Sequence, residues 1–88
     1  MRAFAINEIK DAIAIQTEIY PNPANDLLQI MSLLEIENIK IYNPQGNLQF
    51  TAIKPGKSMD ISFLSSGFYF IKLQDINGNI SEHTLIKM

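Results

Sequence analysis

The chain has 88 residues, of which 47% are hydrophobic, and its formal net charge is −2. This length fits one domain, and a chain this short buries only about 60% of its unfolded surface, so the core must use most of the apolar residues. The absence of cysteine excludes disulfides, thiolate nucleophiles and Cys-ligated zinc. Seven basic and nine acidic residues, spread along the chain, leave no electrostatic footprint for nucleic acid or an anionic membrane.

The first residues do not form a secretory signal peptide, because Asn7, Glu8 and Lys10 interrupt the apolar run. No window approaches the ~18 consecutive apolar residues of a membrane span, so the sequence predicts a soluble chain. Residues 3–16 also fit an amphipathic helix, but no capping residue precedes them. We interpret residues 1–12 as a frayed tail or linker that leads into a strand at about residue 13.

From residue 12 onward, short apolar runs rich in Ile, Phe and Tyr alternate with polar residues, as in half-buried strands. Pro21 and Pro23 end the first run, and glycine-containing turns are predicted at 43–47, 54–57 and 77–79. The predicted strands cover residues 12–20, 26–32, 34–43, 48–53, 58–63, 68–73 and 80–88. About seven strands with a turn every 8–12 residues or so are typical of an all-β sandwich. The run at 68–73 is nearly continuous in apolar residues, which favours a central strand buried on both faces.

The sequence predicts no catalytic residue, no metal site and no cofactor. His83 is the only histidine, and its neighbour Glu82 points to the opposite face of a strand, which favours a lone surface histidine over a catalytic one. Two clusters of side-chain oxygens, at 22–26 and 75–79, each contain one carboxylate, whereas a tight calcium site needs several. Asn and Asp in turns usually bond to their own backbone, and this is the interpretation we favour.

Adjacent aromatic residues at 68–70 also suggest an aromatic platform for a sugar. Neighbours on a strand point to opposite faces, so core packing explains them better. The residues alone therefore predict a small all-β module of the binding, spacer or recognition class.

Four blocks of the sequence then resemble one known family, the C-terminal sorting domain of type IX (Por) secretion cargo. The first block is Tyr-Pro-Asn-Pro at 20–23, followed by a short apolar strand. The second is Ile-Lys-Ile-Tyr-Asn at 39–43, followed by Gly46. The third is similar to the family's Leu-x-x-Gly-x-Tyr-apolar-apolar-Lys block and lies at 64–72, and the fourth is the terminal Leu-Ile-Lys at 85–87. The blocks occur in the family's order, over roughly residues 13–88, which we therefore take as the domain.

The resemblance implies an Ig-like antiparallel β-sandwich at the C-terminus of a larger secreted precursor. It implies an upstream cargo that carries its own N-terminal signal, an outer-membrane translocon that receives the domain, and a sortase-like peptidase that removes it. The cargo is then expected on the cell surface or in the medium. In the family the cleavage point lies upstream of the sandwich, which makes residues 1–16 a candidate region. The domain is an address and not an enzyme.

The resemblance also implies a set of sorting-motif residues, and that recognition depends on residues 67–88. The set is Tyr20, Pro21, Asn22, Pro23, Tyr42, Gly46, Gly67, Tyr69, Lys72 and Lys87. We expect a receptor strand to add to an exposed edge of the terminal hairpin, with Lys72 and Lys87 as polar contacts. The same edge offers a route to a homodimer. The alternative function is that of an Ig-like carbohydrate-binding or adhesion module.

Overall fold

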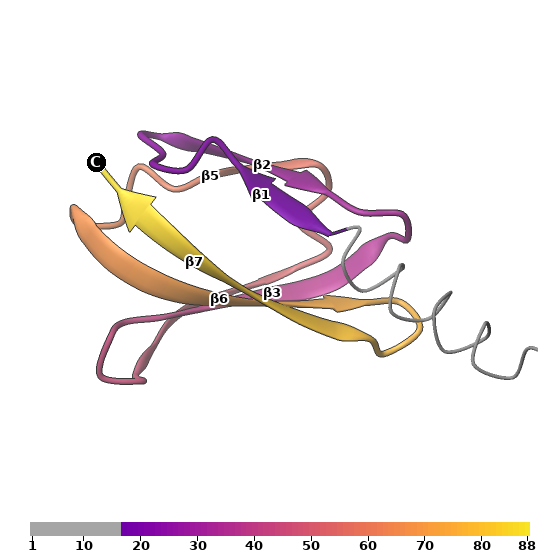
Figure 1. The fold of residues 1–88 in the computed structure, drawn as a ribbon. Coiled ribbons are helices and arrows are strands. Elements are labelled where there is room, and N and C mark those ends of the chain that lie inside the picture. The colour runs from indigo at the N-terminus through magenta and orange to yellow at the C-terminus, as the bar shows by residue number, and fades with distance from the viewer. Residues whose placement is uncertain (1–16) are drawn as a thin grey trace, which may run out of the picture.

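The computed structural model describes residues 17–88, and the predicted tail at 1–12 lies outside the described residues. In the described part the chain is all-β and forms two antiparallel sheets that pack face to face (Figure 1). The strands are β1 (Glu18–Tyr20), β2 (Leu27–Met31), β3 (Ile36–Tyr42), β4 (Leu48–Ile53), β5 (Ser58–Asp60), β6 (Gly67–Asp75) and β7 (Ile80–Lys87). The predicted seven-strand sandwich is therefore confirmed.

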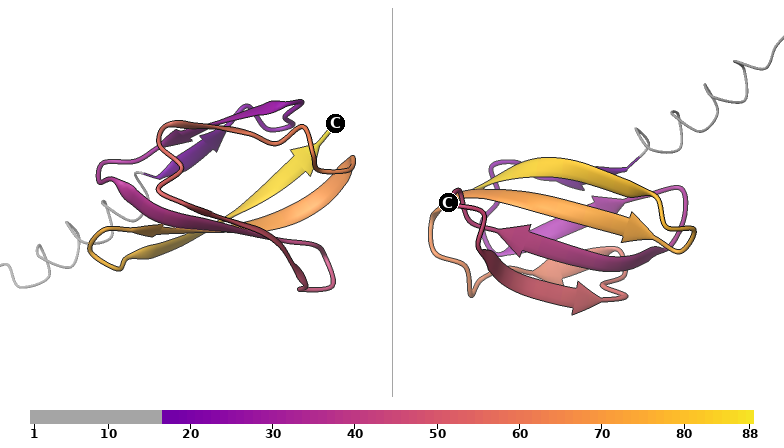
Figure 2. Two further views of the ribbon diagram at one scale, coloured as in Figure 1. Left: turned by 180° about the vertical axis from the view of Figure 1, so that it is seen from behind. Right: turned by 90° about the horizontal axis from the view of Figure 1, so that it is seen from below.

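The two sheets contain three and four strands, in the orders β1-β2-β5 and β4-β3-β6-β7. Figure 2 shows the four-stranded sheet from below, with β7 and β4 at its two edges. Every named strand pair is antiparallel. Along the chain, β1 and β2 belong to one sheet, β3 and β4 to the other, β5 to the first again, and β6 and β7 to the second. This order is that of an Ig-like sandwich in which β4 pairs with β3.

The core consists of the inward-facing residues of both sheets. Its largest fully buried side chains are Leu28, Ile39, Ile41, Ile61, Ile71, Leu73 and Leu85. Isoleucine suits this position because its branched side chain packs well on a pleated surface. The buried residues of this one cluster come from β2, β3, β6 and β7 and from the loops, and partly buried residues of β1, β4 and β5 pack against it, so the two sheets share a single core.

The strand at 68–73 is central as predicted, but the prediction that both its faces are buried is wrong. Along β6 the residues alternate, with Tyr69, Ile71 and Leu73 buried and the residues between them exposed. No second layer covers the outer face of the four-stranded sheet in the described residues, so Phe68 and Phe70 lie at the surface. The apolar run is continuous because β6 has apolar residues on both faces: one face packs in the core, and the other has Phe68 and Phe70 at the surface.

The predicted strand at 58–63 is shorter than expected and ends at Asp60. The Asp60 carboxylate accepts a hydrogen bond from the N–H of Ser62 at 2.8 Å, and the N–H of Leu64 donates to the Ile61 carbonyl at 3.0 Å. These local bonds form a turn after Asp60, where the sequence predicts that the strand continues to residue 63. The predicted strand at 12–20 is described only from residue 17, and β1 covers its last three residues.

Tyr69 fixes the loop that enters β6. Its hydroxyl donates to the main-chain oxygen of Ser65 at 2.7 Å, and its ring is 7% exposed. A tyrosine near the start of this strand whose hydroxyl bonds to the backbone a few residues upstream is the tyrosine corner of Ig-like sandwiches. One of the predicted sorting-motif residues therefore has a direct structural role.

Candidate functional site

The segment that connects β1 to β2 crosses to the edge of the other sheet and contacts β7. We call residues 21–24 the strap. The Asn22 side-chain Nδ2 donates to the main-chain oxygen of Thr84 at 2.8 Å, and the N–H of Ile86 donates to Asn22 Oδ1 at 2.9 Å. A primary amide presents a donor and an acceptor side by side, as a peptide group does. The Asn22 side chain therefore takes the place of a neighbouring strand.

The strap continues this pairing with its own backbone. The N–H of Ala24 donates to the Ile86 carbonyl at 2.9 Å, and the N–H of Met88 donates to the Ala24 carbonyl at 2.8 Å. Ala24 is fully buried and forms a parallel bridge with Lys87. Both peptide bonds that precede the strap prolines, Tyr20–Pro21 and Asn22–Pro23, are cis. Four hydrogen bonds thus join the strap to the last five residues of the chain.

Lys87 lies inside the molecule, whereas Lys72 lies on the surface. The Lys87 side chain is 6% exposed, and its Nζ is 4.0 Å from Asp26 Oδ1 and 3.2 Å from the main-chain oxygen of Met88. The Lys72 ammonium is 3.9 Å from a carboxylate oxygen of Glu82 and 5.7 Å from the centre of the Tyr42 ring. Of the two lysines expected to be polar contacts, only Lys72 is accessible in this fold.

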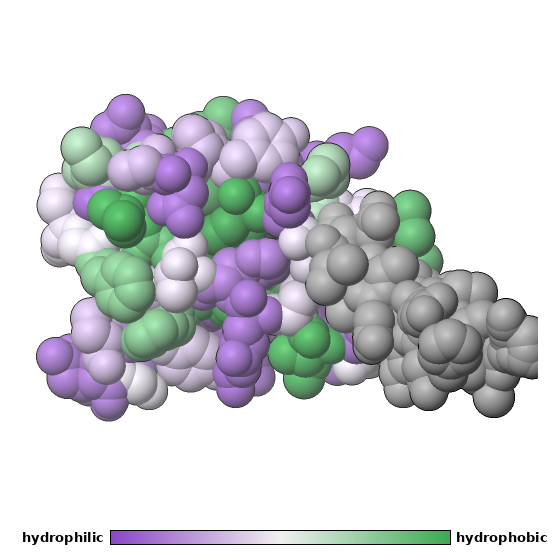
Figure 3. Space-filling view, in the orientation of Figure 1, coloured by the Kyte–Doolittle hydropathy of each residue, from purple (hydrophilic) through white to green (hydrophobic). Residues whose placement is uncertain are grey.

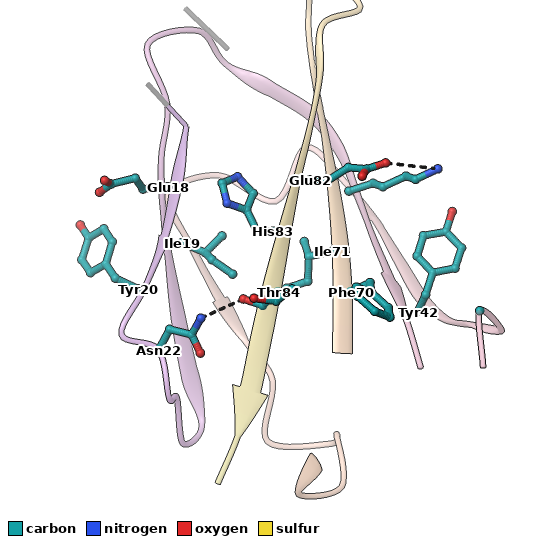
Figure 4. Close-up of a pocket in the computed structure, with 12 residues that line it drawn as sticks. Glu18, Ile19, Tyr20, Asn22, Tyr42, Phe70, Ile71, Glu82, His83 and Thr84 are labelled. Atoms are coloured by element: carbon teal, nitrogen blue, oxygen red, sulfur yellow. Dashed lines mark hydrogen bonds and ion pairs between the residues drawn. The ribbon is translucent and has the colours of Figure 1, made fainter. Parts of the chain in front are cut away.

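A broad depression of about 1060 Å³ runs along β7 and is shown in Figure 4. On one side of the strand, His83 points toward β1 and Asn22 bonds to the strand itself; on the other side, Glu82 pairs with Lys72. Five predicted sorting-motif residues line this depression, namely Tyr20, Asn22, Tyr42, Gly46 and Lys72. The fold thus brings the first two sequence blocks and part of the third to one strand.

The outer face of the four-stranded sheet has an apolar patch near the C-terminal end of β7. We define the outer patch as Tyr42, Leu48, Phe68, Phe70 and Ile86. The strand register places Tyr42 opposite both Leu48 and Phe70, and Phe68 opposite Ile86. The rings of Phe68 and Phe70 meet edge to face, with centroids 5.2 Å apart, and each residue is just over 40% exposed.

In the space-filling view, apolar surface gathers at the end of the molecule where β7 ends (Figure 3). Rings that lie in one plane would form a flat platform against which a sugar could stack. Phe68 and Phe70 stand at 79° to each other and Tyr69 faces the core, so the geometry does not favour that alternative.

His83 is half-buried, with Nε2 3.3 Å from the Thr17 hydroxyl. Burial lowers the pKa of His83 below its ordinary value of 6.5, and the nearby Glu18 carboxylate partly offsets this effect. Glu82 is on the opposite face, as expected, so the two do not form an acid–base pair. Among residues 17–88, no group of three or more acidic or histidine side chains is arranged to hold a metal ion.

The oxygen cluster at 75–79 is satisfied within its own turn, as the sequence predicted. Asp75 Oδ1 accepts hydrogen bonds from the N–H groups of Asn77 and Asn79, both at 2.9 Å, and Oδ2 accepts one from Asn79 Nδ2 at 3.0 Å. In the other cluster, the Asn22 amide is bound to β7 instead.

Comparison with protein-family models finds a match over residues 18–87, which is most of the chain, to the secretion system C-terminal sorting domain. The chain belongs to this family. The sorting domain is a C-terminal signal for type IX secretion. No curated protein sequence matches the chain. In the described residues, no helix of the sorting domain has the length and apolar character to cross a membrane.

The structure of the sorting domain separates the predicted motif residues by environment. Tyr69 and Lys87 face the interior, Tyr42 and Lys72 lie on the outer face, and Pro21, Asn22 and Pro23 belong to the strap. Gly46 and Gly67 have positive φ angles of 88° and 153°, in a turn and at the start of β6. Sequence reasoning missed Phe68, Phe70 and Ile86 as surface residues. The i, i+2 spacing of Phe68 and Phe70 on β6 was the available signal, because such residues share one face of a strand. Ile86 joins them through the register of β6 and β7, which places it opposite Phe68.

Proposed function

We propose that this domain delivers an attached upstream cargo to the type IX outer-membrane translocon, through the periplasm, and that the cargo ends on the cell surface or in the medium. A sortase-like peptidase then removes the domain. The domain acts as an address and has no catalytic role of its own. Family membership carries this proposal, and the gathering of the sequence blocks around β7 supports it.

We propose further that the translocon contacts the outer patch. Monomeric proteins rarely leave large apolar side chains in a contiguous surface group without a binding role. Phe68, Phe70 and Ile86 come from the third and fourth sequence blocks, and Tyr42 comes from the second. Aromatic residues in such a patch supply much buried area at low cost in side-chain entropy.

The test fuses the full chain to a reporter that is exported to the periplasm, in a bacterium that has type IX machinery. We expect the reporter on the surface or in the medium for the wild-type fusion, and in the periplasm for Phe70→Ser. The matched control is Ile53→Ser, because Ile53 is also exposed, at 66%, but lies on β4, at the opposite edge of the sheet.

A wild-type fusion that stays in the periplasm would contradict the sorting function. Equal secretion of the Phe70→Ser and Ile53→Ser fusions would contradict the role of the outer patch alone. Thermal unfolding of both variants establishes that each is folded.

A further inference from the structure

The main chain of β7 is paired on both sides at its end, although β7 is an edge strand. On one side it pairs with β6 along its whole length. On the other side, the strap bonds to Thr84, Ile86 and Met88. An unprotected edge is a template for pairing with any other chain, so proteins cover edges. We expected a receptor strand to add to an exposed edge of the terminal hairpin, but at residues 84–88 the strap already occupies the edge of β7.

The strap also sets which way the side chains of β7 point. With Asn22 bonded to Thr84 and Ile86, Ile86 points outward beside Phe68, and Lys87 points inward beside Asp26. A slip of one residue in a strand moves every side chain to the opposite face. Such a slip would remove Ile86 from the outer patch and expose the Lys87 ammonium.

Asn22 is suited to this task because its side-chain amide donates to Thr84 and accepts from Ile86, so one side chain bonds to two residues of β7. The residue is exposed, and its two hydrogen bonds reach residues 62 and 64 positions away. These bonds connect the first and the last sequence blocks of the family directly.

We propose that Asn22 is a positioning residue that holds the end of β7 in place and in register, and that the sorting machinery recognises the domain in this held form. This inference rests on the proposed function. This mode of recognition differs from β-strand addition by a receptor, because a receptor strand that pairs with residues 84–88 would have to displace the strap.

The first measurement is site-resolved amide hydrogen exchange on the full chain. In Asn22→Ala we expect the Ile86 amide to exchange about tenfold faster or more, since two ordinary hydrogen bonds to this strand end are lost. The Ile71 amide, on a central strand, reports global opening, so its rate shows how much overall stability the variant loses. The Asn47 amide bonds to Asn43 Oδ1 in the distant turn 43–47, can open without breaking the strap bonds, and should be unchanged. Asn22→Asp keeps the acceptor for the Ile86 N–H and replaces only the donor to Thr84, so we expect a smaller increase. The matched control is Asn25→Ala, an exposed asparagine in the same connection.

The second measurement is secretion of the same variants in the reporter fusion. If the inference is correct, Asn22→Ala frees the strand end and lowers secretion well below that of Asn25→Ala. Unchanged Ile86 exchange in Asn22→Ala would show that the strap does not hold the strand. A freed strand end with equal or higher secretion would show that the held form is not what the machinery recognises. Failure of the wild-type fusion itself to be secreted would refute the sorting function, whereas the exchange data would still decide whether Asn22 holds the strand.

Discussion

At the scale of single residues, two turns of this domain use the same chemistry. In the turns 43–47 and 75–79, the first side chain accepts hydrogen bonds from the N–H groups two and four residues later. The fourth residue of each is a glycine with φ of 88°, which side chains other than glycine's rarely adopt. The sequence predicted both turns from their Asn, Pro and Gly content, because this chemistry is local.

The two turns differ in burial, which leads to a prediction about stability. Asp75 is 4% exposed and accepts three hydrogen bonds, whereas Asn43 is less buried and its side chain accepts two. Hydrogen bonds to a charged group contribute about 1.5–3 kcal/mol, and neutral ones about 1. We therefore expect Asp75→Ala to lower the free energy of unfolding by about 2–3 kcal/mol and Asn43→Ala by about 1. Urea unfolding measures both, and equal losses would contradict the role given to burial.

His83 should make the stability of the domain depend on pH. Because burial lowers its pKa in the folded state, the unfolded chain binds more protons than the folded one as the pH falls through about 6.5. The contribution of neutral His83 is therefore fully present above this pH and is lost below it. We expect the urea midpoint to fall between pH 7.5 and 5.5 for the wild type and to change less for His83→Gln. A parallel decline in both proteins would assign the effect to other groups.

At the scale of the elements, β6 shows what an apolar run can and cannot predict. The run located the strand and its central position correctly, since such runs are rare at edges. It did not predict which face is covered, because that depends on how the two sheets stack. The contacts of Asn22 with β7 and the burial of Lys87 were beyond prediction for the same reason: each depends on residues more than 60 positions away in the sequence.

The alternation along β6 predicts opposite outcomes for two neighbouring residues. Ile71 is fully buried, so Ile71→Ala should lower the free energy of unfolding by about 2–5 kcal/mol through the cavity that it leaves. Phe70 is 42% exposed on the outer face, so Phe70→Ala should cost much less, about 1 kcal/mol. Denaturant unfolding compares them, and a similar loss for both would mean that the outer face is covered in solution.

At the scale of the whole molecule, the proposed contact residues Phe68, Phe70 and Ile86 lie on the same two strands, β6 and β7, as residues of the core. We expect that removing residues 67–88 abolishes secretion. This result would not locate a signal, because the deletion takes away β6 and β7, two of the four strands of the larger sheet. The inward residues of these strands belong to the core. Point variants that keep the domain folded are therefore needed to separate recognition from folding.

Lys87→Met is the variant that separates them at the end of the chain. Methionine keeps most of the buried, apolar length of the lysine and removes a charge that is only 6% exposed. Its partner Asp26 is 79% exposed, so the replacement leaves no unpaired charge buried. We expect the midpoint of thermal unfolding to be unchanged or higher. If the machinery recognises the folded domain with the strap in place, the Lys87 ammonium is inaccessible, and secretion of the reporter fusion should be retained. Loss of secretion without loss of stability would instead show that the ammonium itself is contacted, which requires the end of β7 to leave the sheet. If the ammonium is contacted, Asn22→Ala should raise secretion, because freeing the end of β7 exposes Lys87. The secretion of the two variants, Lys87→Met and Asn22→Ala, therefore decides whether the machinery recognises a held or an opened strand.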